Sequence, residues 1–543
     1  MTDTSVSYSY DRIPRASPLL LDYLYHFERV SQFYEAPPFR LSSYQAVASQ
    51  VGGFAKHRAE LCAILMRQNQ AFGCGPATFE NLQKLARAGT FAVVTGQQVG
   101  LFGGPAFTLY KALTTVRVAN YLSEQGVPVV PVFWLASEDH DLAEVAAVGT
   151  LDEEYNLISL ADSGKAPSAR SPVGNVRLTE QTTQALDRLE TCLPAGPARE
   201  GLLRDLREIY APGATWVEAF GKFLARLLSQ WGVIFLNSFD PAVHQLSAEV
   251  YSQALERAPE LREKLLERSN LLSANGYHAQ VKVAEDSTLV FVMRQGNRLP
   301  IHQRDGDYLV EGKEKFRLEE LRREVADEPM AFSANALLRP LVQDTLLPTI
   351  AYIAGPSELA YLGQAQVLYR AFGRPQPVLF PRAAFTLLDY RIQRWLEKYR
   401  LSLEDIWQGD EHLRGKIAAA GLAEGWSERF DQAQQEMAGL LARLRSDVER
   451  LDPTLLDALQ HAQEKILYQL DRLRAKLSRA GVARSDLLGR HAHALSQYLM
   501  PQKDLQERRV GGVYFLGRAG YDLLPRLLSQ TRTDSPGHLV MSL

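Results

Sequence analysis

The sequence predicts an α/β protein in which an open, doubly wound parallel sheet precedes a region of long helices. Apolar runs at residues 91–94 and 127–136 enclose a stretch with helical spacing, and this strand–helix–strand order is typical of parallel sheets. Further apolar runs at 231–241, 348–355 and 376–386 raise the expected number of buried strands to about five. After about residue 390 glycine becomes sparse, and the helix formers Leu, Ala, Arg, Glu and Gln dominate.

The bulk composition is that of a globular protein. The chain has 543 residues, which predicts two or three domains or one elaborated core. Its 60 basic and 63 acidic residues leave a net charge of −3, so we expect no nucleic-acid partner and no anionic membrane partner. The longest apolar run, 127–136, is shorter than the roughly 20 residues of a membrane helix.

The cysteines and the first residues indicate the compartment. Cys62, Cys74 and Cys192 are scattered, and no Cys/His cluster has the spacing of a structural zinc site. So few cysteines fit a reducing compartment. The first residues show no charged-then-apolar signal pattern. We therefore expect a soluble cytoplasmic protein, and we assign no metal-binding residues.

The core elements follow in order. Residues 1–90 have mostly helical patterns, and "FAVV" at 91–94 is a strand that ends in "TGQQVGLFGGP". Gly104 and Pro105 then begin a helix, because proline is favoured at the first helical position. The stretch 287–310 is typical of short antiparallel strands joined at glycine-containing turns.

The C-terminal region predicts two long helices. Apolar residues between Met437 and Leu477 recur in steps of 3, 4 and 4, an 11-residue period typical of straight or slightly right-handed helices. Asp452 and Pro453 interrupt the run with a capping residue and a first-turn proline. We expect a helical hairpin whose apolar seam supplies a dimer contact. The alternative is that the two helices satisfy only each other.

These patterns divide the chain into regions. We expect an N-terminal helical region packed on the core (1–90), a core (91–390) with insertions near 151–215 and 271–330, an α-helical coiled-coil domain (391–500), and a C-terminal segment that returns to the core (501–543).

A glycine-rich segment follows the first predicted strand. Its four glycines and two adjacent glutamines exceed what a tight turn requires, although an ordinary turn is the alternative. Glycine lets the backbone approach a ligand and direct N–H groups at an anion. The segment has neither the Gly-Lys-Ser/Thr of a P-loop nor G-x-G-x-x-G. We predict that it binds substrate or nucleotide through Thr95, Gly96, Gln97, Gln98, Gly103 and Gly104.

Three acids and a histidine follow the next predicted strand, in "SEDHDLAE". In an open parallel sheet, ligands bind beyond the carboxyl ends of the strands. Histidine can act as a base, and adjacent carboxylates can raise its pKa, orient one tautomer or hold Mg²⁺. Helix capping explains one or two of the acids but not the histidine. We predict that His140, Asp139 and Asp141 are catalytic and that Glu138 binds a ligand.

Two later segments supply further candidates. "AGPSELAYLGQ" places Ser357 and Glu358 in a first helical turn, with Tyr361 on the face of Glu358. Glu358 can bind a substrate ammonium group and Tyr361 a neighbouring polar group; the alternative is a cap with a core tyrosine. Arg382 can pair bidentately with a carboxylate or phosphate, unless it is simply solvated. "HAH" at 491–493 is expected to be inert surface, because i and i+2 point apart on a helix.

Four motifs give the chain a resemblance to a known family. "VVTGQQVGLFGGPAFTLYKAL", "PVFWLASEDHDLAEV", "AYIAGPSELAYLGQ" and "LMPQKDLQERRV" resemble, in this order, the BshC-type cysteine ligases of bacillithiol biosynthesis. The likeness spans nearly the whole chain. It implies a Rossmann-like core similar to that of class I aminoacyl-tRNA synthetases, with inserted segments, and a coiled-coil domain through which the protein forms a homodimer.

The resemblance also implies a reaction and its substrates. It is the last step of bacillithiol synthesis, in which the carboxyl group of cysteine joins the amine of glucosaminyl malate as an amide. Because a free carboxylate does not form an amide usefully in water, we expect ATP, alone or with Mg²⁺, to activate it as an adenylate or a phosphate. The sequence shows no zinc site for the cysteine thiolate and no signature lysine motif of the synthetases. His140 is the expected base, oriented by Asp139 or Asp141.

Two other functions fit the same residues. The chain can be a dimeric nucleotide-binding accessory protein, which would give product only with a partner enzyme. It can also be a nucleotidyltransferase that activates a different acid, which would show as pyrophosphate exchange dependent on that acid.

Overall fold

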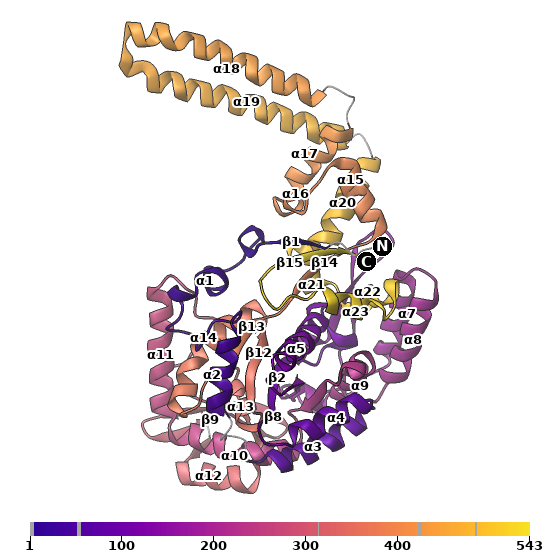
Figure 1. The fold of residues 1–543 in the computed structure, drawn as a ribbon, viewed down its shortest axis with the longest axis vertical. Helices are drawn as coiled ribbons and strands as arrows, with labels where there is room; N and C mark the ends of the chain where they lie inside the picture. Colours follow the sequence, from indigo (N-terminus) through magenta and orange to yellow (C-terminus); the bar gives the residue numbers. More distant parts are fainter. Residues whose placement is uncertain (1–4, 52–55, 313, 422–425, 484–485) are drawn as a thin grey trace.

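A parallel sheet of five strands lies at the centre of the structure (Figure 1). The structure is a computed structural model that describes residues 5–51, 56–312, 314–421, 426–483 and 486–543. In spatial order the strands are β13 (Val378–Pro381), β12 (Thr349–Ala354), β2 (Phe91–Gln98), β3 (Val129–Ala136) and β6 (Ile234–Asn237). The chain starts at the central β2, runs outward through β3 to β6, and returns to place β12 and β13 on the other side of β2. This is a doubly wound strand order, so the predicted Rossmann-like sheet is confirmed.

Strand β2 is longer than the sequence predicts. The apolar pattern stops at Val94, but Thr95–Gln98 continue the ladder in register with Phe133–Ala136 of β3. Thr95 and Gly96 are still buried, and only Gln97 and Gln98 become partly exposed. Gln97 and Gln98 therefore lie at the carboxyl end of β2, and ligands bind beyond the carboxyl ends of the strands in doubly wound folds.

Helices cover both faces of the sheet, as strands that are apolar on both sides require. Phe133 and Leu135 of β3 pack in one core with α5 (Phe107–Glu124) and α9 (Trp216–Leu228). The alternate residues Val132 and Trp134 pack in a second core with the N-terminal helices. These helices are α1 (Pro18–Tyr25), α3 (Arg58–Ala71) and α4 (Pro76–Leu85), while α2 (Leu41–Val51) packs against β12.

Side-chain amides of α3 cover the exposed edge of β6. Asn69 Nδ2 donates to the carbonyl oxygen of Phe235 at 2.8 Å, and the Phe235 N–H donates to Asn69 Oδ1 at 2.9 Å. Gln68 makes the same two contacts with Asn237, at 3.2 and 2.9 Å. These amides replace a sixth strand and satisfy an edge that would otherwise be open to pairing.

Two long segments are inserted between the strands. The first, between β3 and β6, contains α6 (Leu142–Val145), a hairpin of β4 (Ala147–Leu151) and β5 (Leu157–Ala161), α7 (Gln181–Cys192), α8 (Pro197–Ile209) and α9. The second, between β6 and β12, contains α10 (Pro241–Glu256), α11 (Ala258–Ala274), β7 (Ser287–Arg294), β8 (Asn297–Arg304), β9 (Asp307–Val310), β10 (Glu314–Phe316), α12 (Leu318–Asp327), β11 (Phe332–Ala334) and α13 (Arg339–Leu346). Strands β7 to β11 form one antiparallel sheet, in agreement with the antiparallel strands predicted at 287–310. Helix α14 (Pro356–Ala371) then joins β12 to β13.

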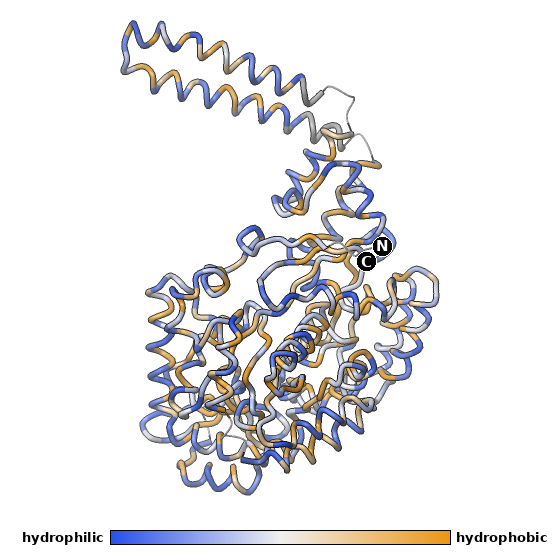
Figure 2. The backbone as a smooth tube through the Cα atoms, in the orientation of Figure 1, coloured by the Kyte–Doolittle hydropathy of each residue, from blue (hydrophilic) through white to orange (hydrophobic). Residues whose placement is uncertain are grey.

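The region after residue 390 is helical, as predicted. Its long helices α18 (Trp426–Leu451) and α19 (Leu456–Ala483) pack against each other as a hairpin that extends away from the sheet (Figure 1). Asp452 caps the turn, because its side chain accepts from the N–H of Thr454. Hydrophilic and hydrophobic residues alternate along both helices (Figure 2). None of the helices described by the structure combines the length and hydrophobicity of a membrane span.

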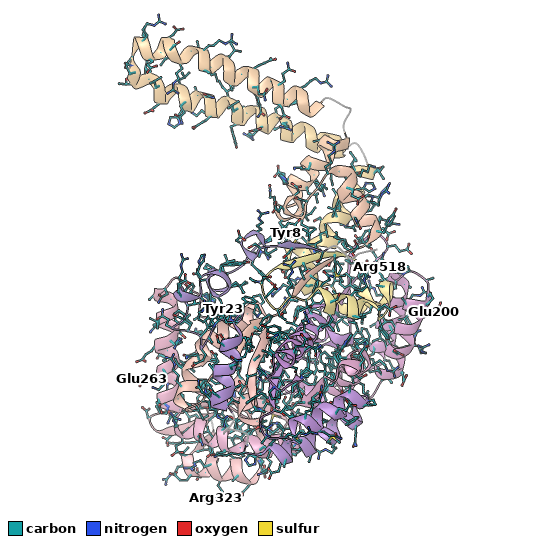
Figure 3. All side chains as sticks on the ribbon, viewed as in Figure 1. Tyr8, Tyr23, Glu200, Glu263, Arg323 and Arg518 are labelled. Atoms are coloured by element: carbon teal, nitrogen blue, oxygen red, sulfur yellow. The ribbon has the colours of Figure 1, made fainter. Side chains whose placement is uncertain are left out.

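Shorter helices and a small sheet connect this hairpin to the core. The helices are α15 (Tyr390–Tyr399), α16 (Leu403–Trp407), α17 (Asp410–Gly421), α20 (Asp486–Leu499), α21 (Gln506–Arg509), α22 (Gly512–Ala519) and α23 (Leu523–Gln530). The sheet pairs β15 (His538–Ser542) with β1 (Val6–Tyr8) and β14 (Ala384–Leu388). Tyr8 meets Trp407 edge-on at this junction, with ring centroids 5.2 Å apart (Figure 3). Both ends of the chain are thus tied to the start of the helical region.

The prediction that "HAH" is inert surface is wrong for His491. Its ring is buried, stacks on Trp395 at a centroid distance of 4.2 Å, and places Nδ1 2.6 Å from the Tyr399 hydroxyl. The two histidines do point apart, and exposed His493 contacts Asn156. Because α20 packs against helices on several sides, one of the two directions leads into the core.

We expect Asn69→Ala to loosen the edge of the sheet. The change removes the two hydrogen bonds to Phe235, together with those to Leu65 and Cys74, and leaves a buried N–H and a buried carbonyl of Phe235 without partners, so local stability should fall by about 2–3 kcal/mol. Hydrogen exchange of the peptide covering residues 233–237 measures this directly. The exposed neighbour Gln70→Ala is the control; equal protection of β6 in both variants would contradict the edge-covering role.

Candidate active site

A cavity of about 590 Å³ opens beyond the carboxyl ends of β2, β3 and β12. These three strands are neighbours in the sheet, so the segments that follow them converge on one space. The predicted site residues that line it are Gly96, Gln97, Gln98, Glu138, Asp139, His140, Ser357, Glu358, Tyr361 and Arg382. The structure therefore brings together all four segments that the sequence singled out, although the roles of these residues stay predictions.

Thr95 and Asp141 do not line this cavity. The Thr95 side chain is buried within the sheet, and its hydroxyl donates to the carbonyl oxygen of Ile353 at 3.0 Å. Asp141 caps α6, where its carboxylate accepts from the N–H of Glu144 at 3.3 Å. Ligand binding by Thr95 is a wrong prediction, because its hydroxyl bridges two strands. For Asp141 the capping alternative is correct.

Gly103 and Gly104 shape a turn and do not offer donors to the cavity. Both have positive φ, 84° and 71°, which favours glycine. The Gly103 N–H donates to the Tyr210 hydroxyl at 3.1 Å, and the Gly104 N–H donates to the carbonyl oxygen of Leu101 at 2.9 Å. The predicted anion-binding loop is therefore wrong at these two positions, because the N–H groups already have partners.

Glu138 pairs with His244 of α10, a residue that the sequence analysis missed. Oε1 of Glu138 lies 2.9 Å from Nε2 of His244, which is 1% exposed. Nδ1 of His244 lies 2.9 Å from the carbonyl oxygen of Phe332. Burial by itself would lower the pKa of His244, but Glu138 and this carbonyl raise it above its ordinary value. Glu138, which we predicted to bind a ligand, is therefore already paired with His244 of the protein itself.

Asp139 holds the turn that follows β3. Its Oδ1 accepts from the His140 N–H at 2.7 Å, and its Oδ2 accepts from Gln98 Nε2 at 2.9 Å. Gln98 Nε2 also donates to Glu144 at 2.9 Å. Burial would raise the pKa of Asp139, but the Arg298 guanidinium and these hydrogen bonds hold it below its ordinary value. Asp139 is therefore ionised and rigidly placed.

His140 has two charged neighbours at the cavity. Its Nδ1 lies 3.3 Å from Nη1 of Arg298 and 3.6 Å from Oδ1 of Asp139. Burial and then the Arg298 guanidinium lower the pKa of His140. Of the three predicted acids, Asp139 is the one beside His140. Within the described residues, no three His, Cys, Asp or Glu side chains are grouped as a metal site would require.

Glu358 is held by Lys111, which the sequence analysis also missed. Lys111 is 1% exposed, and its Nζ lies 2.6 Å from Oε2 of Glu358 and also donates to the carbonyl oxygen of Gly96. The Tyr352 hydroxyl and the Gly355 N–H each donate to Glu358 at 2.8 Å. Burial would raise the pKa of Glu358, but Lys111 and these donors keep it below its ordinary value. The carboxylate already has a cation, which argues against the predicted contact with a substrate ammonium group.

Arg382 is neither solvated nor free. It is buried, and its Nη2 lies 2.6 Å from Oε1 of Glu507, whose other oxygen accepts from the Phe385 N–H at 3.0 Å. The guanidinium also lies over the Phe107 ring, 5.1 Å from its centroid. Arg382 therefore fastens the C-terminal segment to the core from a position in the cavity lining.

The part of the cavity next to α14 carries two further cations, Arg339 and Arg508, beside Glu358. Nη2 of Arg339 donates to the Tyr361 hydroxyl at 2.7 Å, and its guanidinium has no ion-pair partner in the described parts of the chain. Arg508 is only loosely paired, 3.5 Å from Asp504. Ser357 is exposed in the first turn of α14, where backbone N–H groups favour an anion. This wall suits a carboxylate or a phosphate.

Comparison with known families agrees with this architecture. The model of the BshC N-terminal Rossmann-like domain of bacillithiol biosynthesis matches residues 1–383, and that of the BshC C-terminal coiled-coil domain matches residues 385–543. The chain belongs to the BshC family. The boundary between the two BshC models falls between Arg382 and Glu507, so the ion pair of these residues joins the two domains.

Relatives named "Putative cysteine ligase BshC" match almost the whole chain. The one from Koribacter versatilis is 37% identical over 97% of this chain and 98% of its own length. The one from Solibacter usitatus is 36% identical over the same shares. The one from Symbiobacterium thermophilum is 32% identical over 94% of each chain.

We expect His244→Gln to destabilise the protein most at low pH. Because the folded pKa of His244 is raised, its contribution is fully present below the ordinary histidine pKa of about 6.5 and is lost as pH rises through the folded value. The variant leaves Glu138 buried without a cation, a loss of about 3 kcal/mol near pH 6. Thermal unfolding from pH 6 to 9 measures it. Exposed His493→Gln is the control. A difference in melting temperature between His244→Gln and the unaltered chain that grows as pH rises would contradict the pairing.

Proposed function

We propose that this chain is an ATP-dependent cysteine ligase that joins the carboxyl group of L-cysteine to the amine of glucosaminyl malate, the last step of bacillithiol biosynthesis. Membership of the BshC family and the names of the relatives support a cysteine ligase of this pathway. The observation that carries the choice of acceptor is the division of the cavity into an acidic wall and a cationic wall.

The two walls follow from the strand order. Asp139 and Glu144 follow β3, whereas Arg339 and Ser357 lie beside the start of α14, which follows β12. Since β2 lies between β3 and β12, the strand ends that carry the two walls are two inter-strand spacings apart, about 10 Å, and the side chains reach inward from there. Glucosaminyl malate carries its amine on the sugar ring and two carboxylates on the malate group, which is attached at the neighbouring ring carbon. Its amine suits the acidic wall and its malate group the cationic wall.

Amide formation also needs an activated cysteine carboxyl, and ATP with Mg²⁺ is the activator we propose. The Gly103–Gly104 turn does not support phosphate binding, because its N–H groups are used internally. Hydrogen-bond donors suited to a phosphate are present elsewhere in the cavity lining. They are the first turn of α14, which includes Ser357, and the side chain of Arg508. A chain with this activity would work in the cytoplasm, where ATP and free cysteine are available.

Reconstitution tests the reaction. We expect the purified chain, given ATP, Mg²⁺, cysteine and glucosaminyl malate, to form bacillithiol, detected by mass spectrometry together with AMP or ADP. A known active relative assayed alongside is the positive control. Product only after a partner enzyme is added would favour an accessory protein, and pyrophosphate exchange with another acid would favour a nucleotidyltransferase.

We expect Arg339→Met to raise the KM for glucosaminyl malate about 10- to 100-fold with little change in kcat. A charge-assisted hydrogen bond to a carboxylate contributes about 1.5–3 kcal/mol, and it is present in both ground and transition states. Arg323→Met, on the exposed surface of α12, is the matched control (Figure 3). A rise in the KM for ATP alone would assign the cationic wall to the nucleotide instead.

We also propose that the protein is a homodimer through the helical hairpin. Large apolar side chains are exposed along α18, α19 and the turn between them, namely Leu440, Leu444, Leu451, Leu455 and Leu473. A second copy would bury them.

Light scattering should therefore give a mass of about twice 60.7 kDa. Leu440 and Leu444 lie one helical turn apart on α18, so Leu440→Glu with Leu444→Glu should give a monomer. The control replaces exposed Arg443 and Arg445 of the same helix with Glu. A dimer that persists in the leucine variant but is lost in the arginine variant would contradict the apolar contact.

A further inference from the structure

Arg298 carries a positive charge from the antiparallel sheet into the cavity of the parallel sheet. It lies on β8, is 7% exposed, and lines the cavity beside His140. Its backbone N–H donates to the carbonyl oxygen of Arg170 at 3.0 Å, which ties β8 to the first insertion as well. A buried arginine aimed at a histidine needs an explanation, because two cations in contact would repel each other.

Other residues of the antiparallel sheet fix the Arg298 side chain. Nε donates to the Ser333 hydroxyl at 2.9 Å, and Nη2 donates to the carbonyl oxygen of Ala334 at 2.7 Å. The guanidinium lies over the Phe291 ring, 3.9 Å from its centroid. Only Nη1 points to the histidine, 3.3 Å from Nδ1 of His140. The guanidinium is therefore placed before any ligand binds.

This placement decides which nitrogen of His140 carries the proton. A guanidinium has only N–H donors and stays protonated, so the nitrogen that faces it must present a lone pair. Nδ1 of His140 is that nitrogen, and the proton of the neutral ring is then on Nε2. Asp139 does not favour the other tautomer, because its Oδ1 is 3.6 Å from Nδ1 and already accepts the His140 backbone N–H.

We propose that Arg298 is a positioning residue that holds His140 as its Nε2–H tautomer, so that His140 meets the ligand as a hydrogen-bond donor and not as a base. The lowered pKa of His140 agrees with this state. The charged groups that face the ring are Arg298 from β8, Arg170 from the first insertion, and Asp139 and Asp141 from its own loop. The two arginines disfavour a charged ring, and the two aspartates only partly offset them.

The consequence for catalysis rests on the proposed function. As the amine nitrogen forms the C–N bond, the carbonyl π electrons move onto oxygen, and Nε2–H of His140 donates to that oxyanion. The oxyanion electron pair then re-forms the C=O bond of the amide, while the bond from this carbon to the activating phosphate group breaks and its electron pair leaves with the phosphate. The amine proton passes to a carboxylate of the acidic wall. Glu144 is suited to this, because it is exposed and has no ion-pair partner among the described residues.

Nuclear magnetic resonance of the ligand-free full chain tests the tautomer without any assay of activity. Histidine labelled with ¹⁵N distinguishes protonated from unprotonated ring nitrogens, and His140→Gln identifies the signals of His140. We expect an unprotonated Nδ1 and a protonated Nε2 at neutral pH. In Arg298→Met we expect a higher His140 pKa and a mixture of tautomers, whereas Arg294→Met, in the same antiparallel sheet but paired with Glu324, should change neither. A protonated Nδ1 in the unaltered chain would overturn the proposal, whether or not Arg298→Met folds.

Kinetics then separates a donor from a base. Glutamine places an amide donor near the position of Nε2 but cannot take up a proton. Where product forms, we expect His140→Ala to lose about 10²–10³-fold in kcat and His140→Gln to recover much of that loss. Equal losses in both variants would restore the base role and contradict the proposal. Absence of product from the unaltered chain would refute the proposed function and leave the tautomer to be decided by magnetic resonance alone.

Discussion

The site depends on one constraint: a charge buried beneath the cavity needs a partner, because an unpaired buried ion costs several kcal/mol. Glu358, after β12, takes its cation from α5, and Glu138, after β3, takes its cation from α10. Arg382, after β13, takes its anion from the C-terminal segment. Each pair joins a strand end to an element far away in the chain. The same contacts that neutralise these charges therefore dock the helices and the C-terminal domain onto the sheet.

This constraint explains how much of the fold the sequence could predict. Periodicity and apolar runs report local structure, and they were sufficient for the parallel strands, the antiparallel strands at 287–310 and the helical hairpin broken at Asp452. They failed where a local rule gave way to a tertiary contact. Strand β2 continues through Thr95–Gln98 because β3 pairs with it, and His491 is buried because other helices surround α20.

The same limit applies to the candidate site. Glu138 and Glu358 were correctly placed at the cavity, but their partners His244 and Lys111 are more than 100 residues distant, so the acids looked free when they are not. Lys111 did leave a signal, as the one charge among the first ten residues of α5. Arg298 left none, because an arginine in an antiparallel strand is usually solvent-facing. Sequence motifs identify the loops of a doubly wound site better than the cations that insertions bring to it.

The charged side chains of the cavity that lack an ion-pair partner among the described residues indicate which charges a ligand would carry. Lys111, His244 and Arg382 are each matched inside the protein, so a ligand gains little from them. Arg339 and Glu144 have no ion-pair partner within 4 Å in the part of the chain that the structure describes, and the strand order places them on different walls. A molecule that satisfies both would carry an anionic group and an amine on different parts of its structure. A ligand with only one of these groups would leave the other wall to water, and the cavity would discriminate against it.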